Sequence, residues 1–191
     1  GINAFWWKRF SSVYGHLARI FTSYIDGSTP IPEWLVVGRT VLIPKKGDLS
    51  NPANYRPITC LNTLYKLFTG VLNERILRDV QPMWQKIYAQ RGAKRALSGC
   101  KESLLVDRCV LRDSIQYHRN LSVAWVDYRK AFDSTSHELI FLLLECLEVE
   151  ENIVRCLKDL APLWRTRFTI TSGGGQLTSG LVQYRRGVFQ G

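Results

Sequence analysis

Acidic residues are scarce in this sequence of 191 residues. Aspartate and glutamate together number 16, against 26 lysines and arginines, and no two aspartates are adjacent. The formal net charge of +10 favours a polyanionic partner such as nucleic acid. A basic solvated surface without a partner is the alternative, which charge alone does not exclude. The basic residues gather in a glycine-containing loop, with Arg91, Lys94, Arg95 and Lys101, and around a candidate hairpin, with Arg165, Arg167, Arg185 and Arg186.

Long apolar runs and signal-peptide patterns are missing as well. No segment approaches the roughly 20 apolar residues that a membrane helix needs, so we predict no membrane partner. The five cysteines are odd in number and never spaced C-x-x-C, which excludes the usual zinc framework. Three of them lie among apolar neighbours in helical stretches, where we expect buried reduced thiols, as in an intracellular protein.

Hydrophobic periodicity predicts helices that alternate with strands, an α/β (or α+β) fold with a small antiparallel sheet. The stretch from Thr135 to Glu138 matches a capping box that would begin a helix. Because the sequence starts at Gly1 rather than methionine and stops at Gly191 without a tail, we expect a fragment of a longer protein. The predicted helices cover residues 3–25, 61–79, 101–119, 139–147 and about 150–160, and the predicted strands lie within 34–47, at 121–126 and on both sides of the glycines at 173–175.

One carboxylate stands at a position suited to metal chemistry. Asp127 follows the apolar run 121–126, at the end of a predicted strand, where the loops of α/β folds gather ligands. Magnesium prefers oxygen ligands, commonly one or two carboxylates with substrate phosphates, and two ions about 3.5–4 Å apart can clamp an in-line phosphoryl transfer. The alternative is that Asp127 only ends a strand and that Asp133 only caps the following helix.

Several stretches, in the expected order, resemble the reverse transcriptases of LINE-type (non-LTR) retrotransposons. The first catalytic motif of those polymerases is similar to VDYRKAFDSTSH, and the start of their second palm motif is similar to RRGVFQG. Their fingers segment, with its I-P-K and N-Y-R-P-I signatures, is similar to LIPKKGDLSNPANYRPITCLNTLYKLF. The stretches FWWKRF and QRGAKRALSGCKESLL resemble the elements before and after the fingers segment, so the resemblance covers nearly the whole chain.

The resemblance implies a role for each matching residue. Asp127 would bind both catalytic Mg²⁺ ions, for which Mn²⁺ could substitute, and Tyr128 beside it would help to hold the metal and the triphosphate. Phe132 resembles the gate whose ring occupies the space of a 2′-hydroxyl and so favours deoxynucleotides. The remaining implied contacts are Arg56, Lys45 or Lys46, Gln190 and Gly191 with the incoming nucleotide, and Arg91, Lys94, Arg95 and Lys101 with nucleic acid.

The resemblance also implies a right-hand polymerase fold. A single partial reverse transcriptase domain would occupy residues 1–191, with residues 1–120 mainly in the fingers and residues 121–191 mainly in an incomplete palm. Such polymerases need an adjacent Asp-Asp pair in a hairpin after the second palm motif, and this sequence contains no such pair. We therefore expect the palm to be truncated before that hairpin, and this chain alone to be inactive.

By this resemblance, the parent protein is an RNA-directed DNA polymerase. It would add deoxynucleoside triphosphates to a DNA primer on an RNA template, inside the cell and in the nucleus. An inactive RNA-binding module derived from such a polymerase is the alternative. A small-molecule α/β enzyme is a third option, but the glycines of SGGGQ lie between two predicted strands, whereas a phosphate-binding loop joins a strand to a helix.

Overall fold

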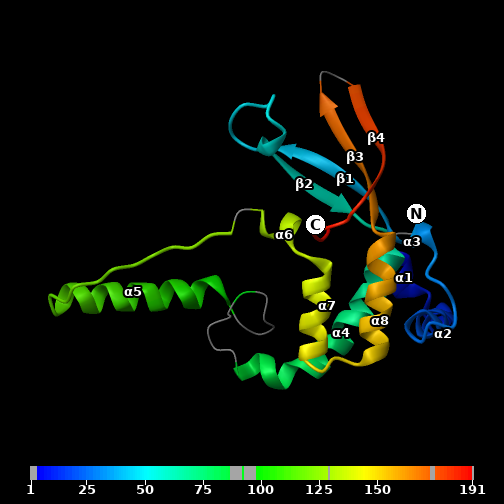
Figure 1. Ribbon diagram of the computed structural model, residues 1–191, viewed down its shortest axis with the longest axis horizontal. Coiled ribbons are helices and arrows are strands. Elements are labelled where there is room, and N and C mark those ends of the chain that lie inside the picture. The colour runs from blue at the N-terminus through cyan, green and yellow to red at the C-terminus, as the bar shows by residue number, and fades with distance from the viewer. Residues whose placement is uncertain (1–3, 87–91, 93–97, 129, 173–174, 191) are drawn as a thin grey trace. The chain divides into compact units, whose positions relative to one another are not determined.

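Helices and strands both contribute to the structure, a computed structural model that describes residues 4–86, 92, 98–128, 130–172 and 175–190. This mixture confirms the predicted α/β fold class (Figure 1). The chain forms two compact units, one made of Gly1–Val80 with Lys130–Gly191 and the other of Gln81–Arg129. Within the described ranges, no helix has both the length and the apolar content that crossing a membrane requires.

The first unit is built on a four-stranded sheet. Its strands are β1 (Val37–Pro44), β2 (Tyr55–Cys60), β3 (Arg165–Ser172) and β4 (Gly175–Gln183), in the order β2-β1-β3-β4. The outer pairs are antiparallel, as the predicted small antiparallel sheet requires, but the central β1–β3 pair is parallel, so the sheet is mixed. The reason is the connection: β3 returns beside β1 after a long crossover through helices, which is the route that parallel pairing requires.

Helices precede β1 and form the long crossover from β2 to β3. They are α1 (Ala4–Arg9), α2 (Tyr14–Ile25), α3 (Glu33–Val36), α4 (Thr63–Lys86), α5 (Cys100–Gln116), α6 (Ala131–Ser134), α7 (His137–Cys146) and α8 (Glu151–Leu160), with 3₁₀ turns η1 (Ser11–Val13), η2 (Pro52–Asn54) and η3 (Ala161–Leu163). The predicted capping box does not form at α7. Thr135 instead donates its hydroxyl to the carbonyl oxygen of Ala131 (2.8 Å), and Ser136 caps the helix without a side-chain bond.

The hydrophobic core of the first unit lies where α2, α4 and α8 pack together (Figure 1). Phe68 on α4 is fully buried, and its ring centroid lies 5.0 Å from that of Phe21 on α2. Ile153 and Leu160 of α8 are also fully buried. Phe21 and Phe68 belong to the apolar stripes that the sequence predicted by three-and-four spacing, so part of each stripe forms the core. Phe10, in the same predicted helix as Phe21, is exposed, and the helix is interrupted at that residue.

Two ionisable side chains in this unit are shielded from water. Burial raises the pKa of the Cys156 thiol to about 11 and that of the Tyr65 hydroxyl to about 12, so both stay protonated at neutral pH. The other four cysteines are exposed. The expectation of three buried thiols is therefore wrong, because α5 and α7, which carry Cys109 and Cys146, bury none of their residues.

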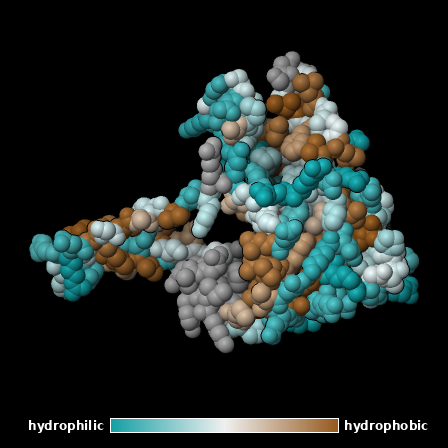
Figure 2. Space-filling model, in the orientation of Figure 1, coloured by the Kyte–Doolittle hydropathy of each residue, from teal (hydrophilic) through white to brown (hydrophobic). Residues whose placement is uncertain are grey.

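The second unit contains the end of α4, α5 and the extended segment after it. α5 confirms the predicted helix at 101–119, but its apolar side chains lie on the surface (Figure 2). The prediction of a buried strand at 121–126 is wrong: Trp125 and Val126 are 79% and 80% exposed. A strand must bond its N–H and C=O groups to a neighbouring strand, and none of the described residues pairs with this segment.

Three buried threonine hydroxyls tie the central strands together. Thr40 Oγ1 on β1 lies 2.8 Å from Thr59 Oγ1 on β2 and 2.8 Å from Thr166 Oγ1 on β3. All three residues are buried, so each hydroxyl depends on another for its hydrogen bond. The bonds fix the register of the sheet, because a shift of one residue would turn these side chains to the opposite face.

We expect Thr40→Val to lower the free energy of unfolding by about 1–3 kcal/mol, because the hydroxyls of Thr59 and Thr166 would lose their shared partner inside the protein. Urea-induced unfolding measures this change. Thr171→Val, at an exposed position of β3, is the matched control and should change stability by less than about 0.5 kcal/mol. Equal stability of the two variants would contradict a structural role for these hydrogen bonds.

Candidate functional site

Two stretches of the sequence that carry the family resemblance, AFDSTSH and RRGVFQG, are hydrogen-bonded to each other in the first unit. The backbone N–H of Gly187 donates to the carbonyl oxygen of Thr135 at 2.8 Å. The N–H of Val188 donates to the carbonyl oxygen of Phe132 at 2.9 Å. Two segments about fifty residues apart in the sequence thus form one junction, with the two hydrogen bonds made by backbone atoms alone.

Gly187 is the point of closest approach in this junction. Its φ angle is +81°, a conformation that residues with a side chain rarely adopt. A Cβ atom at this position would lie 2.8 Å from the carbonyl oxygens of both Phe132 and Asp133. Those neighbours are backbone atoms and cannot turn aside, so the junction requires glycine here.

Side-chain contacts also fix the stretch RRGVFQG in place. The Nε2 atom of His137 lies 2.7 Å from the carbonyl oxygen of Gly187, which places the proton of the ring on Nε2. The His137 ring packs edge-on against Trp164, with centroids 5.1 Å apart. Phe189 contacts Trp164 and Tyr184, at centroid distances of 5.7 and 4.7 Å. The glycine and the phenylalanine of RRGVFQG are therefore both anchored.

Gln190 is held by its side chain and by its backbone. Its Nε2 atom donates to Asp133 Oδ1 at 2.7 Å, and its carbonyl oxygen accepts from the N–H of Thr59 on β2 at 2.6 Å. The first bond orients the amide and leaves its Oε1 atom as an acceptor for another group. Asp133, for which the sequence suggested only helix capping, positions Gln190 instead.

Several residues predicted to contact a nucleotide lie in this unit. Phe132 lies on α6 at the junction and is 62% exposed. The residue that follows it, Asp133, accepts the hydrogen bond from Gln190. Arg56 is exposed on β2, the strand that also bonds to Gln190. Lys45 and Lys46 are exposed in the turn after β1. The structure thus brings Phe132 and Gln190 together and joins them to the strand of Arg56.

Other predicted residues lie elsewhere in the chain. Asp127 and Tyr128 belong to the second unit, where both are exposed at the end of the extended segment, and Lys101 lies in the first turn of α5. Among the residues that the structure describes, no three His, Cys, Asp or Glu side chains are grouped closely enough to hold a metal ion. The predicted residues that lie outside the described ranges are Arg91, Lys94, Arg95 and Gly191.

The sequence prediction missed three contributors to the junction. Thr59 and His137 were part of quoted stretches but carried no predicted role, and their partners, Gln190 and Gly187, are far along the chain. Nothing in their local spacing indicates such long-range bonds. Gly187 had a weak signal, because a glycine shortly after a strand-like run is typical of a turn with positive φ.

Comparison with known proteins relates the chain to the Pol polyproteins of R2 retrotransposable elements, which confirms the resemblance seen in its motifs. It is 36% identical, over 169 residues, to the retrovirus-related Pol polyprotein from type-1 retrotransposable element R2 of Popillia japonica. It is 29% identical, over 161 residues, to the retrovirus-related Pol polyprotein from type-2 retrotransposable element R2DM of Drosophila melanogaster.

These alignments take in most of this chain but a small part of each relative. They cover 87% and 84% of the chain, and 22% and 14% of the two polyproteins, respectively. The chain therefore spans less than a quarter of the length of these relatives. No protein-family model matches the chain.

We expect Gly187→Ala to lower the free energy of unfolding by roughly 1–3 kcal/mol, because the new Cβ atom would meet two carbonyl oxygens and the positive φ would be strained. Urea-induced unfolding measures the loss, and hydrogen exchange at the N–H groups of residues 187 and 188 should become faster. Gly70→Ala is the control, since Gly70 lies in α4 with open space around its Cα; it should stabilise by about 1 kcal/mol. Unchanged exchange in Gly187→Ala would show that the junction does not depend on this glycine.

Proposed function

We propose that this chain is part of an RNA-directed DNA polymerase of a non-LTR retrotransposon. The parent protein would add deoxynucleotides to a DNA primer on an RNA template, inside the cell and in the nucleus. The observation that carries the proposal is the junction itself: Gln190 is bonded to Asp133, next to Phe132, and to β2. The relationship to R2 Pol polyproteins supports the same reaction class.

In this proposal the first unit receives the incoming deoxynucleotide. The planar guanidinium of Arg56 offers forked donors that match phosphate oxygens, and Lys45 or Lys46 adds a second cation. The exposed ring of Phe132 would stand against the sugar, where a 2′-hydroxyl would collide with it. Gln190, held by Asp133, would place its free Oε1 atom beside the nascent base pair, and the adjoining Gly191 would let the backbone approach closely.

The metal chemistry would depend on the second unit. Two Mg²⁺ ions, or Mn²⁺ in their place, would neutralise the charge that develops on the transferred phosphate. Asp127 suits a hard cation because its carboxylate is exposed and oxygen is the ligand that Mg²⁺ prefers; Tyr128 would assist beside it. The sequence holds no adjacent Asp-Asp pair, so we propose that these 191 residues alone do not polymerise and that the parent protein supplies the other carboxylates.

The division into fingers and palm follows from the same proposal. Residues 1–120 would form mainly the fingers, and residues 121–191 the beginning of the palm. The basic stretch that contains Arg91, Lys94, Arg95 and Lys101 would contact the sugar-phosphate backbone of the template, a kind of contact that adds affinity without sequence choice.

A second candidate function is an RNA-binding module that has lost catalysis. The formal net charge of +10 suits RNA binding whether or not the protein polymerises, which is the observation that favours this alternative. The two functions differ in one property: only the polymerase requires Asp127, because binding to RNA does not depend on a bound divalent ion.

In the longer parent protein, we expect Asp127→Ala to abolish primer extension and leave RNA binding unchanged. Activity should fall by more than the roughly 10- to 100-fold that follows the loss of an outer-shell partner, because Asp127 would be a direct metal ligand. Extension of a labelled DNA primer on an RNA template measures the activity, and a filter-binding assay measures RNA affinity. Asp159→Ala, an exposed aspartate on α8, is the control. Full activity in Asp127→Ala would remove this residue from the mechanism, and an inactive parent protein would favour the binding module.

We also expect Phe132→Ala to relax the choice of sugar. Without the ring, the preference for a deoxynucleotide over the matching ribonucleotide should fall by roughly 10- to 100-fold, while incorporation of deoxynucleotides continues. Single-nucleotide incorporation with each sugar measures the ratio in the parent protein. The control is Phe10→Ala, at an exposed phenylalanine that stacks on Trp6. An unchanged ratio would show that Phe132 is a packing residue only.

A further inference from the structure

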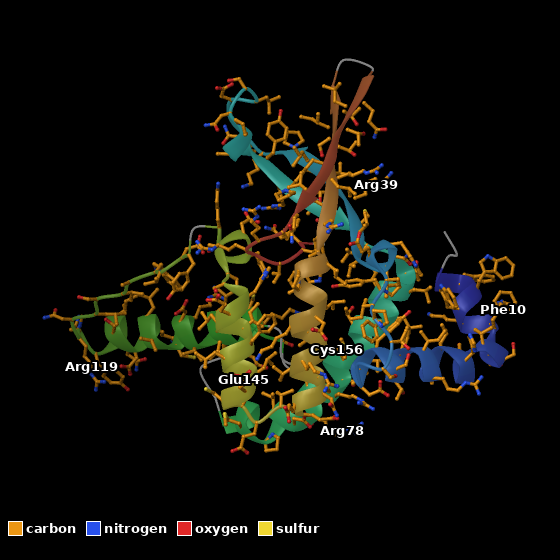
Figure 3. All side chains as sticks on the ribbon, turned by 45° about the vertical axis from the view of Figure 1, so that its right-hand side comes forward. Phe10, Arg39, Arg78, Arg119, Glu145 and Cys156 are labelled. Atoms are coloured by element: carbon orange, nitrogen blue, oxygen red, sulfur yellow. The ribbon has the colours of Figure 1, made fainter. Side chains whose placement is uncertain are left out.

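Two arginines lie directly beside each other on neighbouring strands of the sheet. Arg39 on β1 is the register partner of Arg167 on β3, and Figure 3 shows Arg39 on this sheet. Adjacent strands are about 4.8 Å apart, so the two side chains leave the sheet at neighbouring points. Both residues are exposed.

Buried residues on the opposite face of the sheet fix the direction in which these two arginine side chains leave it. Thr40 and Thr166, the sequence neighbours of Arg39 and Arg167, are fully buried and share a hydrogen bond. Side chains alternate between the two faces of a strand, so the buried threonines fix both guanidinium groups on the solvent-facing side. The proximity of the two charges is therefore a consequence of the register.

Like charges at paired positions of a sheet repel each other. Among the residues that the structure describes, neither Arg39 nor Arg167 has a carboxylate partner, whereas the nearby Arg165 forms an ion pair of 2.7 Å with Glu33. The sheet therefore presents two adjacent cations that nothing in the described chain neutralises. An anion bound from outside would relieve the repulsion.

A third arginine lies on the same face. Arg56 on β2 is the register partner of Ile43, which lies four residues after Arg39 on β1. Residues whose positions on a strand differ by an even number point to the same face, and Ile43 and Arg39 differ by four. Arg39, Arg56 and Arg167 therefore share one face. At about 3.3 Å per residue, Arg56 stands roughly 13 Å along the strand from the arginine pair.

We propose that the solvent-facing side of this sheet is a nucleic-acid surface, on which Arg39 and Arg167 together bind the sugar-phosphate backbone of single-stranded RNA. The inference rests on the proposed function and adds a binding surface in which Arg39, a residue without a role in the sequence analysis, acts together with Arg167. Guanidinium forks match phosphate oxygens in geometry and charge. An exposed strand face also suits an extended polyanion better than it suits a small molecule, which needs a concave site.

The test measures the affinity of the 191-residue chain for fluorescently labelled poly(U) over a range of salt concentrations. We expect R39Q/R167Q to bind roughly tenfold more weakly near 0.1 M salt, and the slope of log affinity against log salt to fall by about 1.4, because each phosphate contact on a single strand contributes about 0.7. No metal or nucleotide is added, so the result is independent of whether the parent protein polymerises.

The matched control is R119Q/R165Q, which removes the same net charge from two arginines that already have carboxylate partners, Asp113 and Glu33. It should leave the affinity and the slope close to those of the unmodified chain. Equal weakening in the control would overturn the proposal in favour of a general charge effect. An equal loss of affinity for poly-glutamate in R39Q/R167Q would overturn it in favour of an acidic protein partner.

Folding is checked by thermal unfolding, where relief of the repulsion should leave the melting temperature of R39Q/R167Q unchanged or higher. Should this variant fail to fold, R39K/R167K keeps both charges and removes the guanidinium forks. The lysine variant should bind more weakly with an unchanged salt slope. Affinity equal to that of the unmodified chain would then overturn the proposal.

Discussion

The close approach of backbone at Gly187 is the constraint on which the candidate site depends. The carbonyl oxygens of two neighbouring residues lie only 2.8 Å from the position that a Cβ atom would take, so the second stretch can reach the first only through glycine. The N–H groups of Gly187 and Val188 then donate hydrogen bonds to carbonyl oxygens of the first stretch, and these bonds fix the positions of the residues that follow. Gln190 reaches both Asp133 and β2 only because the chain passes this point.

The register of the sheet depends in the same way on one group of buried hydrogen bonds. The hydroxyls of Thr40, Thr59 and Thr166 satisfy one another and set the register of β1, β2 and β3. That register has consequences on both faces: it buries the threonines on one side and presents arginines on the other. It also places the N–H of Thr59 where Gln190 can bond to it, so sheet and junction form one connected structure.

Much of the local structure could be read from the sequence. The apolar stripes that contain Phe21 and Phe68 indicated helices, which the structure shows to pack together. The order of motifs indicated the family, which the R2 relatives confirm. The exposed segment 121–126 shows where local reasoning fails. Its β-branched and aromatic residues are typical of a strand, but a strand forms only against a partner, and strand pairing is a property of the whole fold.

The sequence by itself determined the helices with strong apolar periodicity, the relationship to retrotransposon Pol polyproteins and the residue types available for chemistry. These properties depend on short-range spacing and on residue identity. Only the tertiary structure decided that Asp133 bonds to Gln190, that His137 bonds to Gly187 and that Arg39 faces Arg167. Each of these contacts joins residues 50 or more positions apart. Their pairing is set by sheet register and by one positive φ angle, neither of which leaves a local signature strong enough to predict the partner.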